Sequence, residues 1–376
     1  MLKRLIRKEG PAEAKGTSLA TLIALHGAGE PGGAVPAPSF TGNVVAYRSI
    51  RMIAEAAASV PLQVREGGEV LADGTLCYLL DCPNPDQSGT ELLEEIYGHL
   101  QTHGNAYIER LDNDGDPRAL FSVHPETVEV TEDGYRQRLK RGERMIRPDV
   151  TGRSPLLHLA LWQPQGGRRG HAPLSTAREA IHLHNAAGAW NRQLLDNAAR
   201  PSGALIHRAK EAGGHLTPEQ FDRLRAELDQ SFAGPRGAGR PLLLDGGLDW
   251  RPMGMTPAEM DFQNLKHSAA RDIALAFGVP PMLLGIPGDN TYANYREANL
   301  AFWRQTVLPL VKKVSGALSG WLEPGRMQRV EPNLAALEAL APERSSRLDR
   351  IAAADFLSDA EKRAAFGYPP QEGGAR

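Results

Sequence analysis

The sequence predicts an α+β protein organised around two long helices that a tight loop joins. Apolar residues at helical spacing run through 256–277 and again through 294–318, and the gap between them is rich in Gly, Pro, Asp and Asn. Earlier in the chain, short strand-like runs recur near 104–109, 119–123, 128–131 and 135–139. With 376 residues, 41% of them hydrophobic, the chain can bury a sizeable core, so we expect two or more sub-domains.

The composition narrows the class of protein. A net charge of −2 argues against tight, sequence-independent DNA binding, which depends on Lys and Arg neutralising phosphates, but it does not exclude a protein past which DNA slides. Cys77 and Cys82, the two cysteines, predict neither a disulfide framework nor a cysteine-based zinc site, and we expect both to be small buried side chains in a reducing cytoplasm. No apolar run reaches the about 18 residues of a membrane span. The basic start of the chain lacks the apolar core of a secretion signal.

The first half of the chain alternates helices and strands. Residues 1–40 are rich in Gly, Pro and Ala and predict a mobile arm. The pattern then predicts a helix over 42–59, a strand over 61–65, a turn across 79–85, a helix from Ser88 or Thr90 to about Thr102, the strands named above, and a linker or strand within 152–164.

Two patterns invite a metal-binding interpretation that their details do not support. The run Asp112-Asn113-Asp114-Gly115-Asp116 begins like a calcium loop, but no glutamate stands at the twelfth loop position, which favours a polar hairpin turn. His182 and His184 are two residues apart on an expected helix and therefore point to different faces. We expect no metal site and no cofactor.

The second half is expected to be mainly helical. Helices are predicted over 174–199, 217–228, 256–277 and 294–318, strands over 201–206, 242–244 and 248–250, a loop over 232–240, and short helices at 334–340 and after Ser358. Thr256 and Glu259 fit a capping box, and Gly278 with Pro280 and Pro281 ends that helix.

The following long helix has its own signals. Asn294 and Glu297 are its expected cap and capping partner, and Pro309 predicts a kink. Ser358 and Glu361 form a further capping box near the end of the chain.

Together these motifs resemble the portal proteins of tailed phages, of the HK97-like type. The resemblance rests on Ala276-Phe277-Gly278-Val279-Pro280-Pro281, Leu284-Gly285, Thr291-Tyr292-Ala293-Asn294, Leu308-Pro309, Gly104-Asn105-Ala106-Tyr107-Ile108-Glu109 and the block at 43–62. The motifs occur in family order across residues 42–320, which one chance motif could not imitate. Gly170-His171-Ala172-Pro173-Leu174 departs slightly from the family's Gly-x-Ser-Pro-Leu, because the serine is absent.

The resemblance implies a portal fold with named parts. These are a flexible arm (1–40), an α+β wing (41–172), a first stem helix (173–200), a small α/β clip (201–255), a second stem helix (256–281), a tunnel loop (282–293), a long kinked wing helix (294–330) and a helical crown or tail (331–376). The expected DNA-channel residues are Leu284, Gly285, Ile286, Pro287, Gly288, Asp289 and Asn290. Lys266, Arg271 and Arg296 are candidate basic residues facing the channel, and Arg236 and Arg240 are candidates for docking at the clip.

The function implied is that of a closed ring, a dodecamer in this family, at one capsid vertex. Double-stranded DNA would pass through the ring without its sequence being read, and the implied protein partners are the major capsid protein, the terminase large subunit and a head-tail adaptor. Assembly would take place in the host bacterial cytoplasm, and the finished protein would lie in the virion. The portal of an infectious phage, a prophage or a gene transfer agent would fit equally.

The sequence offers no positive sign of catalysis. It contains no phosphate-binding Gly-x4-Gly-Lys-[Ser/Thr] loop, no His-Glu-x-x-His, no Gly-x-Ser-x-Gly and no dinucleotide fingerprint. The energy for DNA packaging would therefore come from the terminase. The alternative is a monomeric enzyme or nucleic-acid-binding module whose helices pack into an ordinary core, because an apolar stripe alone does not distinguish a core from a channel wall.

Overall fold

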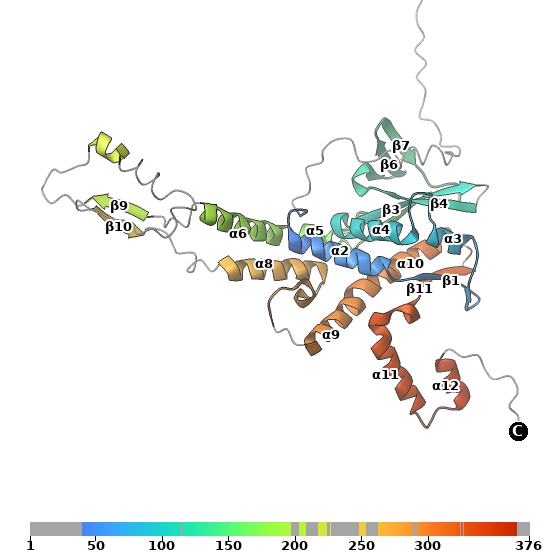
Figure 1. Ribbon diagram of the computed structural model, residues 1–376. Helices are drawn as coiled ribbons and strands as arrows, with labels where there is room; N and C mark the ends of the chain where they lie inside the picture. The colour runs from blue at the N-terminus through green and yellow to red at the C-terminus, as the bar shows by residue number, and fades with distance from the viewer. Residues whose placement is uncertain are drawn as a thin grey trace, which may run out of the picture. The chain divides into compact units, whose positions relative to one another are not determined.

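The computed structural model describes residues 40–113, 116–196, 203–207, 217–223, 226, 248–252, 262–288, 292–323, 325 and 327–366 (Figure 1). The chain divides into two compact units. One consists of Met1–Thr176 together with Ala274–Arg376, and the other is the continuous stretch Ala177–Ile273. The expected arm at 1–40 lies outside the described residues except for Phe40.

Two packed helices open the first unit. In Figure 1, α2 (Val44–Ala58) lies against α4 (Gly89–His103), and Ile53 and Ile96 are fully buried. The Asn43 side chain caps α2 by accepting hydrogen bonds from the amides of Val45 and Ala46. Ser88 and Glu91 form the capping box of α4, so the expected helix starts are confirmed.

An antiparallel sheet joins the early and late parts of this unit. Its strand order is β11-β1-β2, with β1 at Leu62–Glu66, β2 at Glu69–Leu71 and β11 at Gln328–Pro332. Val64 pairs with Val330, and both side chains are buried. The boundary expected after residue 330 falls within β11, which pairs with β1. The pattern did not predict β2 or α3 (Thr75–Asp81).

Two further three-stranded sheets form the core of the expected wing. One has the order β4-β3-β8, and the other the order β5-β6-β7. The strands are β3 (Asn105–Asn113), β4 (Asp116–Val123), β5 (Val128–Thr131), β6 (Gly134–Leu139), β7 (Gly142–Ile146) and β8 (Leu156–Ala160), with the short helix η1 (Pro125–Thr127) after β4. They share an apolar cluster that contains Tyr107, Val128, Tyr135 and Leu156. Asn113 pairs with Asp116, which confirms the hairpin at the calcium-like run.

The part of the second unit that the structure describes contains two long helices, a helical stretch at 218–223 and a pair of antiparallel strands. The helix α6 (Arg178–Asp196) follows the short α5 (Pro173–Thr176) of the first unit. The strands β9 (Gly203–His207) and β10 (Leu248–Pro252) pair antiparallel. The helix α8 (Phe262–Phe277) contacts α6 through Trp190 and Phe262, whose ring centroids are 5.9 Å apart, and its last turn belongs to the first unit. The expected Thr256 cap lies outside the described residues.

The long helix after the loop has three parts. They are α9 (Tyr292–Ala301), the π-helix η3 (Phe302–Val307) and α10 (Leu308–Leu322). The expected cap at Asn294 is wrong, because the helix has already begun at Tyr292. Pro309 lies in the first turn of α10, directly after the π-helix, so the irregularity expected at Pro309 takes the form of a wider hydrogen-bonded turn before it.

Three contacts hold the carboxyl end of α10 in place. The Arg110 guanidinium on β3 lies 5.2 Å from the centre of the Trp321 ring and donates a hydrogen bond to the Trp321 carbonyl oxygen at 3.1 Å. The indole nitrogen of Trp321 donates to the carbonyl oxygen of Ser154 at 2.8 Å. These contacts fix the long helix against the sheet at its carboxyl end.

Small helices complete the first unit. After β11 come η4 (Leu334–Ala336), η5 (Glu338–Leu340), α11 (Ala341–Ala352) and α12 (Asp359–Ala365). The capping box of Ser358 and Glu361 is confirmed, whereas α11 was not predicted. The expected burial of both cysteines is wrong, because Cys82 is exposed and Cys77 is only half-buried.

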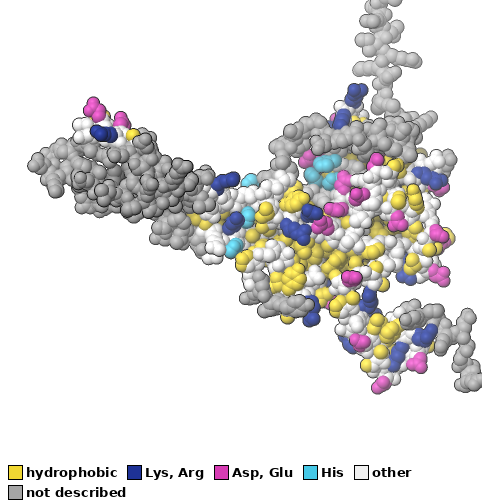
Figure 2. All heavy atoms as spheres, viewed as in Figure 1, with side chains coloured by type: hydrophobic (Ala, Val, Ile, Leu, Met, Phe, Trp, Pro, Cys, Tyr) yellow, Lys and Arg dark blue, Asp and Glu magenta, His cyan; other side chains and the backbone are white. Residues whose placement is uncertain are grey.

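A cluster of three histidines lies between α4 and η1. The ring centroids of His99, His103 and His124 are 5.2 to 6.1 Å apart, and Figure 2 shows a group of histidine side chains on this face of the wing. Burial, aided by the charges of His124 and His103, lowers the pKa of His99 to about 3. Burial and His124 also lower the pKa of His103, against the opposing effect of Glu126.

This cluster predicts acid sensitivity. An unfolded histidine has a pKa of about 6.5, so below that pH the unfolded chain binds protons that folded His99 does not. The free energy of unfolding should fall as pH drops from 6.5 towards 4.5, by about 1.4 kcal/mol per pH unit for each such proton. Urea titrations across this range should give a shallower slope for H99Q than for the wild type, and equal slopes would contradict the assignment.

Candidate functional site

The candidate site is the loop that follows α8, together with the long helix that supports it. α8 ends at Gly278, whose φ of 68° is left-handed. The Gly278 amide donates to the Leu275 carbonyl at 3.0 Å, and the Val279 amide donates to the Ala274 carbonyl at 2.9 Å. This pair of bonds is a Schellman motif, which turns the chain sharply at the helix end.

A second turn of the same kind follows at once. η2 (Pro281–Leu284) ends at Gly285, which is also left-handed with a φ of 72°. The Gly285 amide donates to the Met282 carbonyl at 3.2 Å, and the Ile286 amide donates to the Pro281 carbonyl at 3.1 Å. The first part of the expected tunnel loop is therefore a hydrogen-bonded structure.

The structure separates the expected loop residues into two groups. Ile286 is only 6% exposed and Leu284 is half-buried, whereas Gly285, Pro287 and Gly288 are exposed. Asp289 and Asn290 lie outside the described residues. The expectation that Ile286 faces DNA stays a prediction, and in this subunit its apolar side chain is buried and anchors the loop.

The π-helix η3 holds the start of the loop. The Thr306 hydroxyl donates a hydrogen bond to the Gly278 carbonyl oxygen at 2.5 Å. A Cβ at position 278 would lie 2.9 Å from the Thr306 hydroxyl oxygen, so glycine is required there by space as well as by φ. Thr306 and the close approach to Gly278 were not foreseen from the sequence, where Gly278 was only a helix stop.

The same π-helix also contacts the C-terminal helices. The Arg304 guanidinium forms an ion pair with Glu343, which lies in the first turn of α11. Phe302 and Val307, at the two ends of η3, are buried, and η3 packs against α2. The π-helix η3 thus contacts the loop through Thr306, the helix α2, and the C-terminal helix α11 through Arg304.

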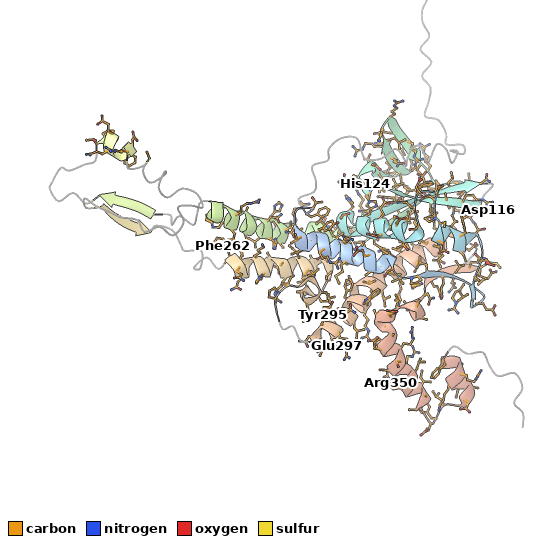
Figure 3. All side chains as sticks on the ribbon, in the orientation of Figure 1. Asp116, His124, Phe262, Tyr295, Glu297 and Arg350 are labelled. Atoms are coloured by element: carbon orange, nitrogen blue, oxygen red, sulfur yellow. The ribbon has the colours of Figure 1, made fainter. Side chains whose placement is uncertain are left out.

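The three candidate basic residues occupy different environments. Lys266 on α8 is half-buried near His184 of α6, and its charge adds to burial in lowering the pKa of His184. Arg271 is exposed on α8. Arg296 is exposed on α9, with a guanidinium nitrogen 4.0 Å from the neighbouring Glu297, and Figure 3 labels Tyr295 and Glu297 on that helix. Arg236 and Arg240 lie outside the described residues.

The site exposes large apolar side chains. Leu275 near the end of α8 is 77% exposed, and Tyr295 on α9 is 52% exposed. Burial of these two side chains against another protein would remove apolar surface from water.

Two other kinds of site are absent from the part of the chain that the structure describes. No group of three or more His, Cys, Asp or Glu side chains there is arranged to hold a metal ion. No helix in the same residues is long and apolar enough to cross a membrane.

Comparison with known proteins gives consistent matches along most of the chain. Residues 44–367 match the model of the family described as phage portal protein. An uncharacterized protein of Rickettsia bellii is 40% identical over 337 residues, which are 87% of both chains. The portal protein of Enterobacteria phage HK97 is 24% identical over 344 residues, 87% of this chain and 79% of the phage protein.

A solved structure is also similar over nearly the whole length. It is titled as the neck of a native GTA particle computed with C12 symmetry. The similar chain in it is 44% identical, with a TM-score of 0.68, over 93% of the present chain and 98% of that chain.

The Gly278 geometry predicts a sharp cost for adding one methyl group. Gly278→Ala should lower the free energy of unfolding by about 2 kcal/mol, because alanine is disfavoured at positive φ and its Cβ would crowd Thr306. Gly98→Ala within α4 is the matched control: nothing lies within 4 Å of its added Cβ, so it should stabilise by about 0.5–1 kcal/mol. Urea denaturation would measure both, and a G278A protein as stable as wild type would contradict the prediction.

Proposed function

The chain belongs to the phage portal protein family, and from this membership we propose that it forms the ring at the unique capsid vertex of a tailed-phage-like particle. Double-stranded DNA passes through the ring during packaging and ejection. The protein acts as a structural element of the virion, and the proposal gives none of its residues a catalytic role.

The observation that carries the proposal is the similarity to the neck structure. The match covers 93% of this chain and 98% of that one, and that neck was computed with C12 symmetry. We therefore propose a ring of twelve copies. The similar neck and a second similar structure both come from native gene transfer agent particles, so a gene-transfer-agent portal is the favoured variant of the function.

Ring closure requires a heterologous contact, in which one face of a subunit meets a different face of the next. An obligate contact of this type buries on the order of 2,000 Å² or more. The exposed Leu275 and Tyr295 support such a contact, because burial between neighbouring copies would remove both from water.

The loop is proposed to guide DNA without holding it. Its exposed described residues are Gly285, Pro287 and Gly288, which carry no charge that would attract phosphate. A ring of identical tips contacts the DNA backbone and reads no bases. Among the candidate basic residues, Arg271 and Arg296 are exposed enough to contact phosphate, whereas the half-buried Lys266 is the weaker candidate.

The remaining partners are proposed from the family. Residues 201–255 would form the clip that meets the terminase large subunit and then a head-tail adaptor, with Arg236 and Arg240 as docking residues. The wing would face the major capsid protein. The terminase, an ATPase by family analogy, would supply the energy for DNA movement.

Assembly is the first test of this function. Purified, tag-free protein should give a light-scattering mass of twelve chains and negative-stain images of rings with a central hole, as the C12 neck suggests. A stable monomer at high concentration, also in the presence of the capsid protein, would contradict the proposal.

The loop tip provides a functional test. Replacing residues 287–290 by Gly-Ser-Gly-Ser while keeping the Ile286 anchor should leave the ring mass unchanged but reduce the DNA retained per particle. The same four-residue replacement at the exposed turn 164–167 is the control and should retain DNA normally. Normal packaging and retention by the 287–290 variant would show that the tip is not a DNA guide.

A further inference from the structure

We propose that the π-helical turn η3 couples the C-terminal helix α11 to the loop after α8, with Thr306 and Arg304 as positioning residues. The functional meaning of this coupling rests on the proposed portal function, in which the loop faces DNA. The coupling itself is a property of one chain and can be measured independently of ring formation.

The hydrogen-bond register of η3 departs from that of an α-helix. The Leu308 amide donates to the carbonyl of Trp303, five residues earlier, instead of four as in an α-helix. Pro309 has no amide hydrogen, so an α-helical register would leave the Gln305 carbonyl without its usual donor. The wider register likewise leaves the Arg304 carbonyl without a donor from Pro309, and the proposed change of register exchanges the acceptor of the Leu308 amide between Trp303 and Arg304.

The two ends of η3 are fixed by burial, while its middle is exposed. Phe302 and Val307 are buried, whereas Arg304 and Gln305 are exposed and Thr306 is half-buried. A shift between the two registers with both ends anchored must rotate the residues between them. Arg304 and Thr306 would then move together, because only one residue separates them.

Thr306 and Arg304 each contact another element of the fold. Thr306 bonds the Gly278 carbonyl, at the point where the loop leaves α8. Arg304 pairs with Glu343 in the first turn of α11. No side chain of α11 is fully buried, so this helix is held weakly enough to change position without disrupting the core.

Through these contacts, α11 can influence the loop, and the loop can influence α11. Displacement of α11 pulls on Arg304 and biases the register of η3, and the register determines whether Thr306 reaches Gly278. Linkage requires the reverse as well, so a load on the loop should change the freedom of α11. The Arg304–Glu343 pair is largely exposed, and we expect its effect to be smaller than that of the Thr306 bond.

Hydrogen exchange of the full-length protein tests this coupling. The reporters are the loop amides with recorded hydrogen bonds, which belong to Gly278, Val279, Leu283, Gly285 and Ile286. Thr306→Val removes the hydroxyl and should speed their exchange about fivefold, whereas Thr306→Ser keeps the donor and should restore the wild-type rate. Glu343→Gln should speed the same loop amides about twofold, although residue 343 is in α11.

The control is Asp349→Asn, which removes a more exposed carboxylate from α11 and should leave the loop amides unchanged. Equal loop exchange in T306V and T306S would overturn the role of Thr306. An effect of E343Q confined to α11 would overturn the coupling. Wild-type protein that forms no rings would defeat the proposed function, whereas exchange results that fail in intact rings would defeat only this inference.

Discussion

The pairing of β1 with β11 is the constraint on which the first unit depends. It joins residues near the start of the folded chain to residues more than 260 positions later, as in the pair Val64 and Val330. The long helix must therefore return to the wing after the loop, and Arg110 and Trp321 fix its end against β3. Within this unit, the two left-handed turns at Gly278 and Gly285 and the Thr306 bond hold the start of the loop.

The loop shows how a site can be precise without a catalytic group. Two successive helix-end motifs and the buried Ile286 consume most of the flexibility that a Gly- and Pro-rich run suggests. A fixed base of this kind would present the tip at the same height in every copy of the proposed ring. For a protein that must let DNA pass, uniform placement matters more than affinity, because strong phosphate binding would oppose movement.

Local signals accounted for much of the fold that the sequence predicted. The capping boxes at Ser88 and Ser358 and the stop at Gly278 are decided within a few residues, and the structure has them. The burial of Ile286, the exposure of Cys82 and the Thr306 bond depend on partners far along the chain, which a single sequence does not reveal. The loop's location was predictable from the family motifs, but the division between its anchor and its tip was not.

The continuous stretch Ala177–Ile273 has a consequence for evolution. It is a separate compact unit, inserted between the two segments that together form the first unit. The first unit therefore contains its own sheets and core. Mutations that remodel the insert leave the β1–β11 pairing and the loop anchors untouched. A lineage could therefore change this stretch, which contains the docking candidates Arg236 and Arg240, while inheriting the β1–β11 pairing and the loop anchors unchanged.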